Sequence, residues 1–328
     1  EALTPPASPL VLDSQDRLLW LGENPRGQRL IQLPPEPLPQ MLVAAFLAAE
    51  DARFYEHRGT DLKALGRAVW GNLRAGRVVS GASTLTQQLA RLAHPAPRTY
   101  YYKLVEMLRS RRIEAALNKD EILRAYLNAV PQGNNLVGVE TAARLYFGKP
   151  AAQLTPPQAA TLAALAKAPG TLNPRGKYRQ RLQSRRDWVL MRMVALGKLS
   201  PEEGLAARQT GLAVRAGSLF PFEAPHFVNL VQALAREGGF GVSRTTLDLP
   251  LQRRAQAIVR SHRSRLQNVG VSQAAAVIIK NRSMEVVVLV GSCHYGPQDQ
   301  GFNNGATARR SPGSTLKPFL SAQALDQG

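Results

Sequence analysis

The stretch "AAEDARFYEHRG", residues 48–59, follows an apolar run and gathers several charged side chains in an arginine-rich sequence. If residues 50–57 are helical, Glu50, Phe54 and His57 fall at positions i, i+4 and i+7, on one face of the helix. That face would carry a carboxylate, an aromatic ring and an imidazole. The stretch therefore has two interpretations: the end of a surface helix with solvated charges, or a helix end that presents a reactive carboxylate.

The sequence around this stretch predicts a helical domain over residues 36–210. It is rich in alanine and leucine, and its apolar residues recur with helical spacing. Gly59 offers a helix stop, and Thr60 or Asp61 offers a cap for the next helix. Breaks at glycine- and proline-containing segments divide the domain into helices near 37–55, 61–75, 84–93, 98–117, 119–129, 138–145, 156–167, 177–197 and 201–209.

The flanking segments have different patterns. Residues 1–35 alternate apolar and polar positions between prolines, which predicts a short β-hairpin or two short strands. Residues 211–240 are mixed and carry prolines, as expected of a linker. Residues 241–328 contain strand-like runs such as "MEVVVLVG" and a helical segment at 250–266, which is typical of an α/β domain. This segment is short for a domain of that kind, so we expect it to be incomplete here.

Composition narrows the class of protein. The 328 residues are 44% hydrophobic and 20% charged, which is typical of a globular chain and not of a disordered one. Lysine and arginine number 42 against 23 acidic residues, for a net charge of +19. Such an excess favours an anionic partner: a nucleic acid, an acidic membrane or a phosphorylated substrate. The single cysteine, Cys293, excludes an internal disulfide and a thiolate metal cluster.

The sequence contains no apolar run of about 18 residues and no signal peptide. It begins with Glu1 and not with methionine. We therefore expect an anchoring segment to precede these residues in a longer protein.

A second stretch, "SGASTLTQQLAR" at residues 80–91, combines small, hydroxyl and amide side chains at a predicted helix start. Helix N-termini bind anions through free N–H groups, and serine and threonine are good N-caps. An ordinary capped helix is the alternative interpretation. The pair Gln87–Gln88 favours a binding role, because we expect neither residue to be needed for capping or for the core.

A third stretch, residues 98–128, places Lys103, Glu106 and Arg109 at i, i+3 and i+6 of a predicted helix. Such charged residues usually form surface salt bridges that contribute about 0.2–0.5 kcal/mol each. The alternative is a row of functional charges along one helix face.

A fourth stretch, "RRSPGSTLKPF" at residues 309–319, places Ser314 three residues before Lys317. If Ser314 opens a helix, both side chains share one face, and the lysine can accept the hydroxyl proton, as Ser–Lys nucleophiles require. A bare S-x-x-K pattern is common by chance, so it predicts little when taken alone.

Taken together, the motifs resemble a known family. "EDARFYEHRG", "GASTLTQQ", "KLVE" with "KDEILRAYLN", and "GVETAARLYFGK", in this order and spacing, are similar to glycosyltransferase family 51. This is the peptidoglycan polymerase domain of class A penicillin-binding proteins. "SPGSTLKPF" resembles the acyl-serine motif of their transpeptidase domain, and the linker and the end of the sequence look most like the one-C subgroup. The resemblance covers residues 9–328.

The resemblance implies a mainly α, lysozyme-like glycosyltransferase domain at 36–210, with the N-terminal hairpin and the start of the α/β transpeptidase domain around it. It implies that Glu50 is the general base that takes the proton from the acceptor's 4-hydroxyl, whose oxygen then attacks the anomeric carbon of a lipid-linked donor with inversion. Asp51, Phe54 and His57 match the rest of the first motif and would shape the site.

Further residues match family positions around the lipid pyrophosphate leaving group. Arg91 and Lys103 would stabilise its negative charge, and Glu106 would orient it as a second catalytic carboxylate. The positions implied to bind donor phosphate or sugar are Ser83, Thr84, Gln87, Gln88 and Asn128. The resemblance implies no metal ligands and no tightly bound cofactor, and it leaves open a divalent cation, Mg²⁺ or Mn²⁺, at the pyrophosphate.

One departure from the family pattern affects donor binding. The third motif normally begins Arg-Lys, and this sequence has Tyr102-Lys103. One phosphate-binding cation is therefore missing, and Arg98 and Arg109 are the candidates to replace it.

The resemblance also implies partners and a location. Lipid II and the growing glycan chain are the expected substrates, at the extracytoplasmic face of the bacterial cytoplasmic membrane. Residues 62–79, with Val69 and Trp70, have the apolar and cationic positions of a membrane-surface segment. Ser314 would be acylated with Lys317 as its base, but the later S-x-N and K-T-G motifs do not follow here. We therefore expect β-lactam binding only in a longer chain.

Two alternatives remain on sequence alone. A lysozyme-type peptidoglycan hydrolase would share the helical composition and the catalytic glutamate, whereas the phosphate-facing cations favour transfer. A basic nucleic-acid-binding module would explain the charge of +19. Against it stand the absence of zinc-finger spacing and of a clear basic recognition helix, and an aromatic content of only 6%.

Overall fold

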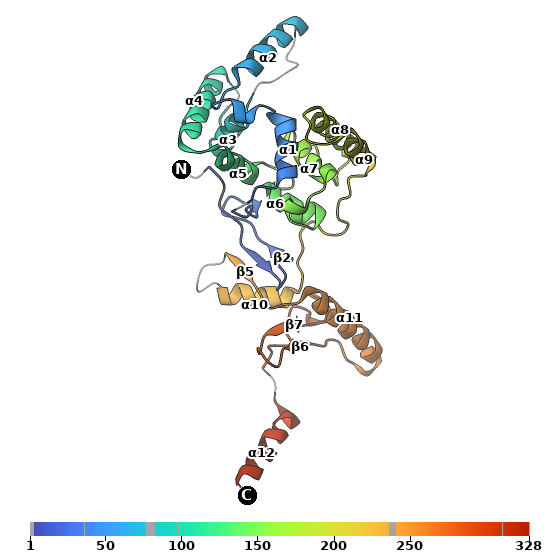
Figure 1. Ribbon diagram of the computed structural model, residues 1–328. Helices are drawn as coiled ribbons and strands as arrows, with labels where there is room; N and C mark the ends of the chain where they lie inside the picture. The colour runs from blue at the N-terminus through green and yellow to red at the C-terminus, as the bar shows by residue number, and fades with distance from the viewer. Residues whose placement is uncertain are drawn as a thin grey trace. The chain divides into compact units, whose positions relative to one another are not determined.

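The computed structural model describes residues 3–35, 37–76, 83–97, 99–235, 241–309 and 311–327, with only the backbone of Val69 and Asn72. The described residues are mainly helical (Figure 1). They divide into two compact units, here called unit 1 (residues 1–9 and 21–221) and unit 2 (residues 10–20 and 222–328). The boundary at residue 221 lies within the segment predicted as a linker.

Unit 1 contains a set of helices and one small two-stranded sheet. Every helical stretch predicted between residues 36 and 210 contains a helix. The helices are α1 (Gln40–Glu50), α2 (Leu62–Ala75), α3 (Leu85–Ala93), α4 (Tyr100–Ala116), α5 (Lys119–Ala129), α6 (Val139–Ala142), α7 (Pro156–Ala166), α8 (Arg179–Ala195) and α9 (Pro201–Gln209), with short turns at Phe54–Glu56, Ala143–Phe147 and Ala151–Gln153. The parallel strands are β3 (Arg29–Leu30) and β4 (Leu136–Val137).

Helix α7 lies at the centre of unit 1. Its residues Ala159–Leu165 are all buried, as expected for a helix that is apolar around its whole circumference. A capping box between Thr155 and Gln158 fixes its start, followed by prolines in its first turn. The helix packs against α1 and α8, while α3 packs against α4 and α5. These two groups of helices hold the residues of the first three sequence motifs.

Helix α1 ends earlier than predicted, and this changes the geometry of the first motif. Asp51 leaves the helical conformation (φ −156°), and a short turn follows at Phe54–Glu56. The prediction that Glu50, Phe54 and His57 share one helix face was therefore wrong. The cause is tertiary: the Asp51 carboxylate accepts a hydrogen bond from the Leu85 backbone N–H, which a continuing helix would prevent.

Unit 2 combines helices with two small sheets. Its elements are β1 (Leu10–Leu12), β2 (Leu18–Leu21, which ends at the unit boundary), α10 (Pro225–Ala235), β5 (Val242–Arg244), α11 (Leu249–Leu266), β6 (Ala276–Ile279), β7 (Val286–Val290) and α12 (Lys317–Gln327), with short turns at Gln267–Val269, Gln298–Gln300 and Gly313–Leu316. Strands β6 and β7 are antiparallel. Helix α10 occupies part of the predicted linker and buries His226, Phe227 and Val228.

The predicted N-terminal hairpin is present, and it belongs to unit 2. Strands β1 and β2 are neighbours in a sheet of order β2–β1–β5. The Asp13 N–H donates to the Arg17 carbonyl across the turn, at 2.9 Å. Strand β1 also pairs in parallel with β5, so that Leu10 lies opposite Val242. Strand β1 is therefore the middle strand of this sheet, and its edge partner β5 lies far from it in the sequence.

Within the described ranges, none of the helices combines the length and the apolar character needed to cross a bilayer.

Candidate active site

A cleft of about 1020 Å³ opens in unit 1 and is lined by residues of α1, α3, α4, α8 and the C-terminal end of α7. It brings together predicted residues from three sequence motifs, namely Glu50, Ser83, Gln88, Arg91, Lys103 and Glu106. Asp51, Phe54, His57, Thr84, Gln87 and Asn128 do not line it. The predicted residues thus divide into a group that faces the cleft and a group behind it.

Glu50 ends α1 at the wall of the cleft, with a side chain that is 11% exposed. Its Oε2 atom accepts a hydrogen bond of 2.9 Å from the Gln88 amide. Its Oε1 atom is buried and has no hydrogen-bond partner among the described residues. A buried oxygen without a donor is costly in a folded protein, and such groups concentrate at reactive sites. Glu50 is therefore held by one oxygen while the other remains available to accept a proton.

The hydrogen-bond chain behind Glu50 fixes the direction of its carboxylate. The Tyr126 hydroxyl donates to Gln88 Oε1 at 3.2 Å, and the Gln88 amide donates onward to Glu50. Burial, assisted by the charge of Glu50, raises the pKa of Tyr126 well above its ordinary value. The phenol thus stays protonated and keeps its role as a donor. Through Gln88, Tyr126 on α5 thus sets the orientation of the Glu50 carboxylate.

Arg185 and Trp188 on α8 line the cleft and were missed by the sequence analysis. The Arg185 guanidinium lies over the Trp188 ring, 3.8 Å from its centroid, and 4.0 Å from Glu50 Oε1. Burial lowers the pKa of Arg185, and the negative charge of Glu50 opposes this shift. The adjacent Arg186 is fully buried and donates to backbone carbonyls. The "SRRDW" sequence does not show which arginine faces the cleft.

Lys103 connects the second and third motifs. Its ammonium donates to Ser83 Oγ at 2.9 Å, to Gln87 Oε1 at 2.9 Å and to Glu106 Oε1 at 2.6 Å. The second oxygen of Glu106 lies 3.5 Å from the Arg91 guanidinium. The Lys103–Glu106 pair is thus part of a network inside the cleft, and the alternative of an isolated surface salt bridge does not apply.

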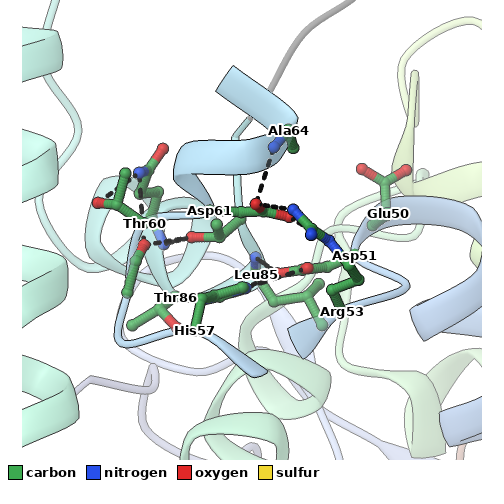
Figure 2. Close-up of polar contacts among 12 residues, drawn as sticks. Glu50, Asp51, Arg53, His57, Thr60, Asp61, Ala64, Leu85 and Thr86 are labelled. Carbon is green, nitrogen blue, oxygen red and sulfur yellow. Dashed lines mark hydrogen bonds and ion pairs between the residues drawn. The ribbon is translucent and has the colours of Figure 1, made fainter. Parts of the chain in front are cut away.

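Behind the cleft, a buried network joins the end of α1 to the start of α3 (Figure 2). Both oxygens of Asp51 lie 3.1 Å from His57 Nε2, and Oδ2 also accepts from the Leu85 N–H at 3.0 Å. Beside this pair, Asp61 caps α2 by accepting from the Ala64 N–H. The Glu50 side chain stands apart from these bonds in Figure 2. Asp51 and His57 therefore hold Glu50 in place without touching the cleft.

The carbonyl of Gly59 organises the second motif. It accepts hydrogen bonds from Thr84 Oγ1 at 2.7 Å, from Ser110 Oγ at 3.3 Å and from the Gln87 amide at 3.4 Å. Gly59 has φ +85°, and a Cβ there would lie 3.0 Å from Ser110. Thr84 also caps α3, as its residue type predicts. Gln87 is 1% exposed, so the expectation that the core does not need it was wrong.

Phe54 and Asn128, two further predicted site residues, are buried and contact other parts of the protein. Phe54 is fully buried beside Tyr55 and His57, with the Lys119 ammonium over its ring. Asn128 Oδ1 accepts from the Leu33 N–H at 2.8 Å. Arg98 lies outside the described residues.

The residues around Glu106 do not form a metal site of their own. Glu106 is already paired with Lys103 and Arg91, and no group of three or more His, Cys, Asp or Glu side chains in the described part of the chain could hold a metal ion. Mg²⁺ is commonly bound by one or two carboxylates together with substrate phosphates. A cation here would thus depend on oxygens from the substrate.

The S-x-x-K residues of unit 2 are exposed to solvent. Ser314 lies in the short turn Gly313–Leu316 and Lys317 begins α12, where no residue is buried. Both side chains are exposed, and neither makes a hydrogen bond or ion pair with another described residue. A predicted serine–lysine contact is therefore not formed.

We expect that Ser314 forms no stable adduct with a fluorescent penicillin. Acylation needs donors aimed at the developing oxyanion, and the fifteen-residue stretch "STLKPFLSAQALDQG" that begins at Ser314 contains neither S-x-N nor K-T-G. In-gel fluorescence measures this, with Ser314→Ala as the background and a full-length penicillin-binding protein as the positive control. Stoichiometric labelling that disappears in Ser314→Ala contradicts the prediction.

Comparison with known families identifies two matching models. The model described as "Transglycosylase" matches residues 20–194, and the model described as "Penicillin binding protein transpeptidase domain" matches residues 274–328. The cleft and every predicted residue behind it lie within the first match.

Curated relatives are similar over much of the chain. Penicillin-binding protein 1C of Escherichia coli K12 is 35% identical over 311 residues, which cover 94% of this chain and 40% of that protein. Penicillin-binding protein 1A of Aquifex aeolicus is 37% identical over 266 residues, which cover 78% and 36%. The chain therefore spans about two fifths of the length of these relatives. The crystal structure of penicillin-binding protein 1A from Haemophilus influenzae matches with a TM-score of 0.39 and 21% identity, over 99% of this chain and 53% of that one.

Proposed function

Because the chain belongs to the transglycosylase family, we propose that unit 1 is a peptidoglycan glycosyltransferase that polymerises lipid II into glycan strands and releases undecaprenyl pyrophosphate. One observation carries the proposal. A glutamate with a buried oxygen that makes no hydrogen bond with any described residue lies in the same cleft as the cationic side chains of Arg91, Lys103 and Arg109. The reaction needs a base on one side and positive charge on the other.

The proton-transfer step uses Glu50. Its carboxylate takes the proton of the acceptor's 4-hydroxyl while that oxygen attacks the anomeric carbon of the donor. The new glycosidic bond forms as the bond to the pyrophosphate breaks, and the leaving group departs with the electron pair. The chain Tyr126–Gln88–Glu50 supports this role because it fixes the base by one oxygen only. Positioned general bases typically contribute about 10²–10⁴-fold to the rate.

The cationic side of the cleft favours transfer over hydrolysis. As the donor bond breaks, negative charge grows on the pyrophosphate, and fixed cations in a partly enclosed site stabilise it. A lysozyme-type hydrolase has no charged leaving group and needs no such set of cations. If a divalent cation takes part, we place it against the substrate phosphates near Glu106.

The decisive experiment incubates the chain with fluorescently labelled lipid II, with and without Mg²⁺. We expect glycan strands on a gel, together with undecaprenyl pyrophosphate. Release of soluble fragments from purified cell wall, with no strands from lipid II, would support the hydrolase instead.

We further propose that α2 contacts the membrane at the extracytoplasmic face, where a polyprenyl-linked substrate is held. At about 100° per residue, Leu62, Leu65, Trp70 and Leu73 fall within an arc of roughly 140°. Lys63, Arg67 and Arg74 fall next to it, as in helices that lie at an anionic interface. Trp70 is 71% exposed and Leu73 is 73% exposed. Residues 77–79 of the predicted segment and the Val69 side chain lie outside the described residues.

Replacing both Trp70 and Leu73 by serine is expected to weaken binding to anionic liposomes by at least about tenfold, because each side chain buries apolar surface on insertion. Flotation measures this. Leu205→Ser, at an exposed apolar position on α9, serves as the control. Equal flotation of the double variant and the control would remove α2 as the contact.

A further inference from the structure

The Lys103 ammonium has no donor left for a substrate. An ammonium group carries three N–H donors. All three have acceptors within the protein, on Ser83, Gln87 and Glu106, at 2.6–2.9 Å. A substrate phosphate could be reached by this group only if one of these bonds breaks. The position of Lys103 is thus that of a residue that organises the cleft wall.

Arg91 also has an acidic partner within the protein. Its guanidinium lies 3.5 Å from Glu106, the same carboxylate that Lys103 contacts at 2.6 Å. Two cations therefore share one acidic group, and part of their charge is neutralised before any substrate arrives.

Arg109 is different from both. It lies on α4 three residues after Glu106 and six after Lys103, lines the same cleft and is half-buried. Its guanidinium makes no hydrogen bond or ion pair with any residue that the structure describes. A guanidinium presents five donors in a planar fork that fits phosphate oxygens in pairs. A partly desolvated cation with no counter-ion among the described residues favours an anion at this place.

The position of Tyr102 agrees with this. Tyr102 lines the cleft seven residues before Arg109, so the two side chains lie on the same face of α4, two turns or about 10.5 Å apart along its axis. Tyr102 brings a ring and a hydroxyl where the family pattern has a cation. Positive charge on this face is therefore displaced towards the middle of α4.

We infer that Arg109 is the residue that binds the pyrophosphate oxygens of the lipid-linked substrate, and that Lys103 is a positioning residue that fixes Ser83, Gln87 and Glu106. This assignment rests on the proposed function for the identity of the natural ligand. The anion site itself rests only on the charges and contacts in the cleft.

The test measures binding of inorganic pyrophosphate by isothermal titration calorimetry at fixed ionic strength. Arg109→Gln is expected to weaken this binding by about ten- to a hundredfold, since a hydrogen-bonded contact to a charged group contributes about 1.5–3 kcal/mol. Arg109→Lys keeps the charge but lacks the planar fork of donors. Its affinity for pyrophosphate should lie between that of Arg109→Gln and that of the unmodified chain. Arg112→Gln removes the same charge from an exposed position of the same helix and should change the affinity less than twofold.

Lys103→Met is expected to weaken pyrophosphate binding less than Arg109→Gln does. The inference is overturned if Arg109→Gln binds pyrophosphate as Arg112→Gln does, if the loss in Lys103→Met is the larger one, or if the unmodified chain binds none. Thermal unfolding of each variant checks that the fold is kept, which is expected because Arg109 has no partner among the described residues.

Polymerisation of lipid II by the same preparations separates the two proposals. Strands formed by the unmodified chain, together with pyrophosphate binding that does not depend on Arg109, would reject this inference and keep the proposed function. Pyrophosphate binding that depends on Arg109, without any strands, would keep the anion site and reject the function.

Discussion

Replacing Glu50 by glutamine is expected to slow glycan polymerisation by at least about 10²-fold and to leave the fold intact. The amide has the shape of the carboxylate and can still accept the hydrogen bond from Gln88, so the packing around α1 should be kept. It cannot take the proton of an attacking hydroxyl. Initial rates with labelled lipid II, and thermal unfolding of the same samples, measure the two parts of this prediction.

Glu56→Gln is the matched control. It makes the same chemical change in the same motif, at an exposed carboxylate six residues further on. Its rate should stay within about twofold of the unmodified chain, as expected for a surface substitution away from the site. Equal rates in Glu50→Gln and Glu56→Gln would exclude Glu50 from the mechanism.

Removing the Asp51 side chain is expected to cost both stability and activity. In Asp51→Ala the Leu85 N–H and the His57 ring lose a buried acceptor, at about 1–3 kcal/mol for each unsatisfied group. The free energy of unfolding should therefore fall by about 2–6 kcal/mol. Because Asp51 ties the end of α1 to the start of α3, the Gln88–Glu50 contact should loosen and polymerisation should slow as well.

Denaturant unfolding followed by circular dichroism measures the loss. Asp51→Asn keeps an acceptor for the Leu85 N–H and should lose less stability than Asp51→Ala. If both variants unfold at the denaturant concentration of the unmodified chain, the buried network does not support the site as described.

Much of the helical unit could be predicted from local sequence. Caps such as Asp61 and Thr84 are short-range signals, and each acts where its residue type suggests. Gly59 was predicted to stop the first helix, but that helix already ends at Glu50. The gathering of Glu50, Gln88, Lys103 and Glu106 in one cleft came from the resemblance to a family and not from spacing.

The predictions that were wrong depended on contacts between segments that lie far apart in the sequence. The early end of α1 follows from the bond between Asp51 and Leu85, which no local pattern reveals. Gln87 is polar and was therefore not expected in the core, but its amide group finds partners on Gly59, Thr60 and Lys103. Arg185 and Arg186 are neighbours in sequence with opposite environments. Only the packing of α8 distinguishes them.

The parallel pairing of β1 with β5 has a consequence for synthesis on the ribosome. Thr245 donates to the Leu12 carbonyl across 233 residues of sequence. At roughly 5–20 residues translated per second, the first strand emerges about 10–50 s before its partner exists. During that interval its outer edge is an open template for other strands. The helices between the two strands can form and pack while this edge waits for β5, so the sheet of unit 2 can close only after most of the chain has been made.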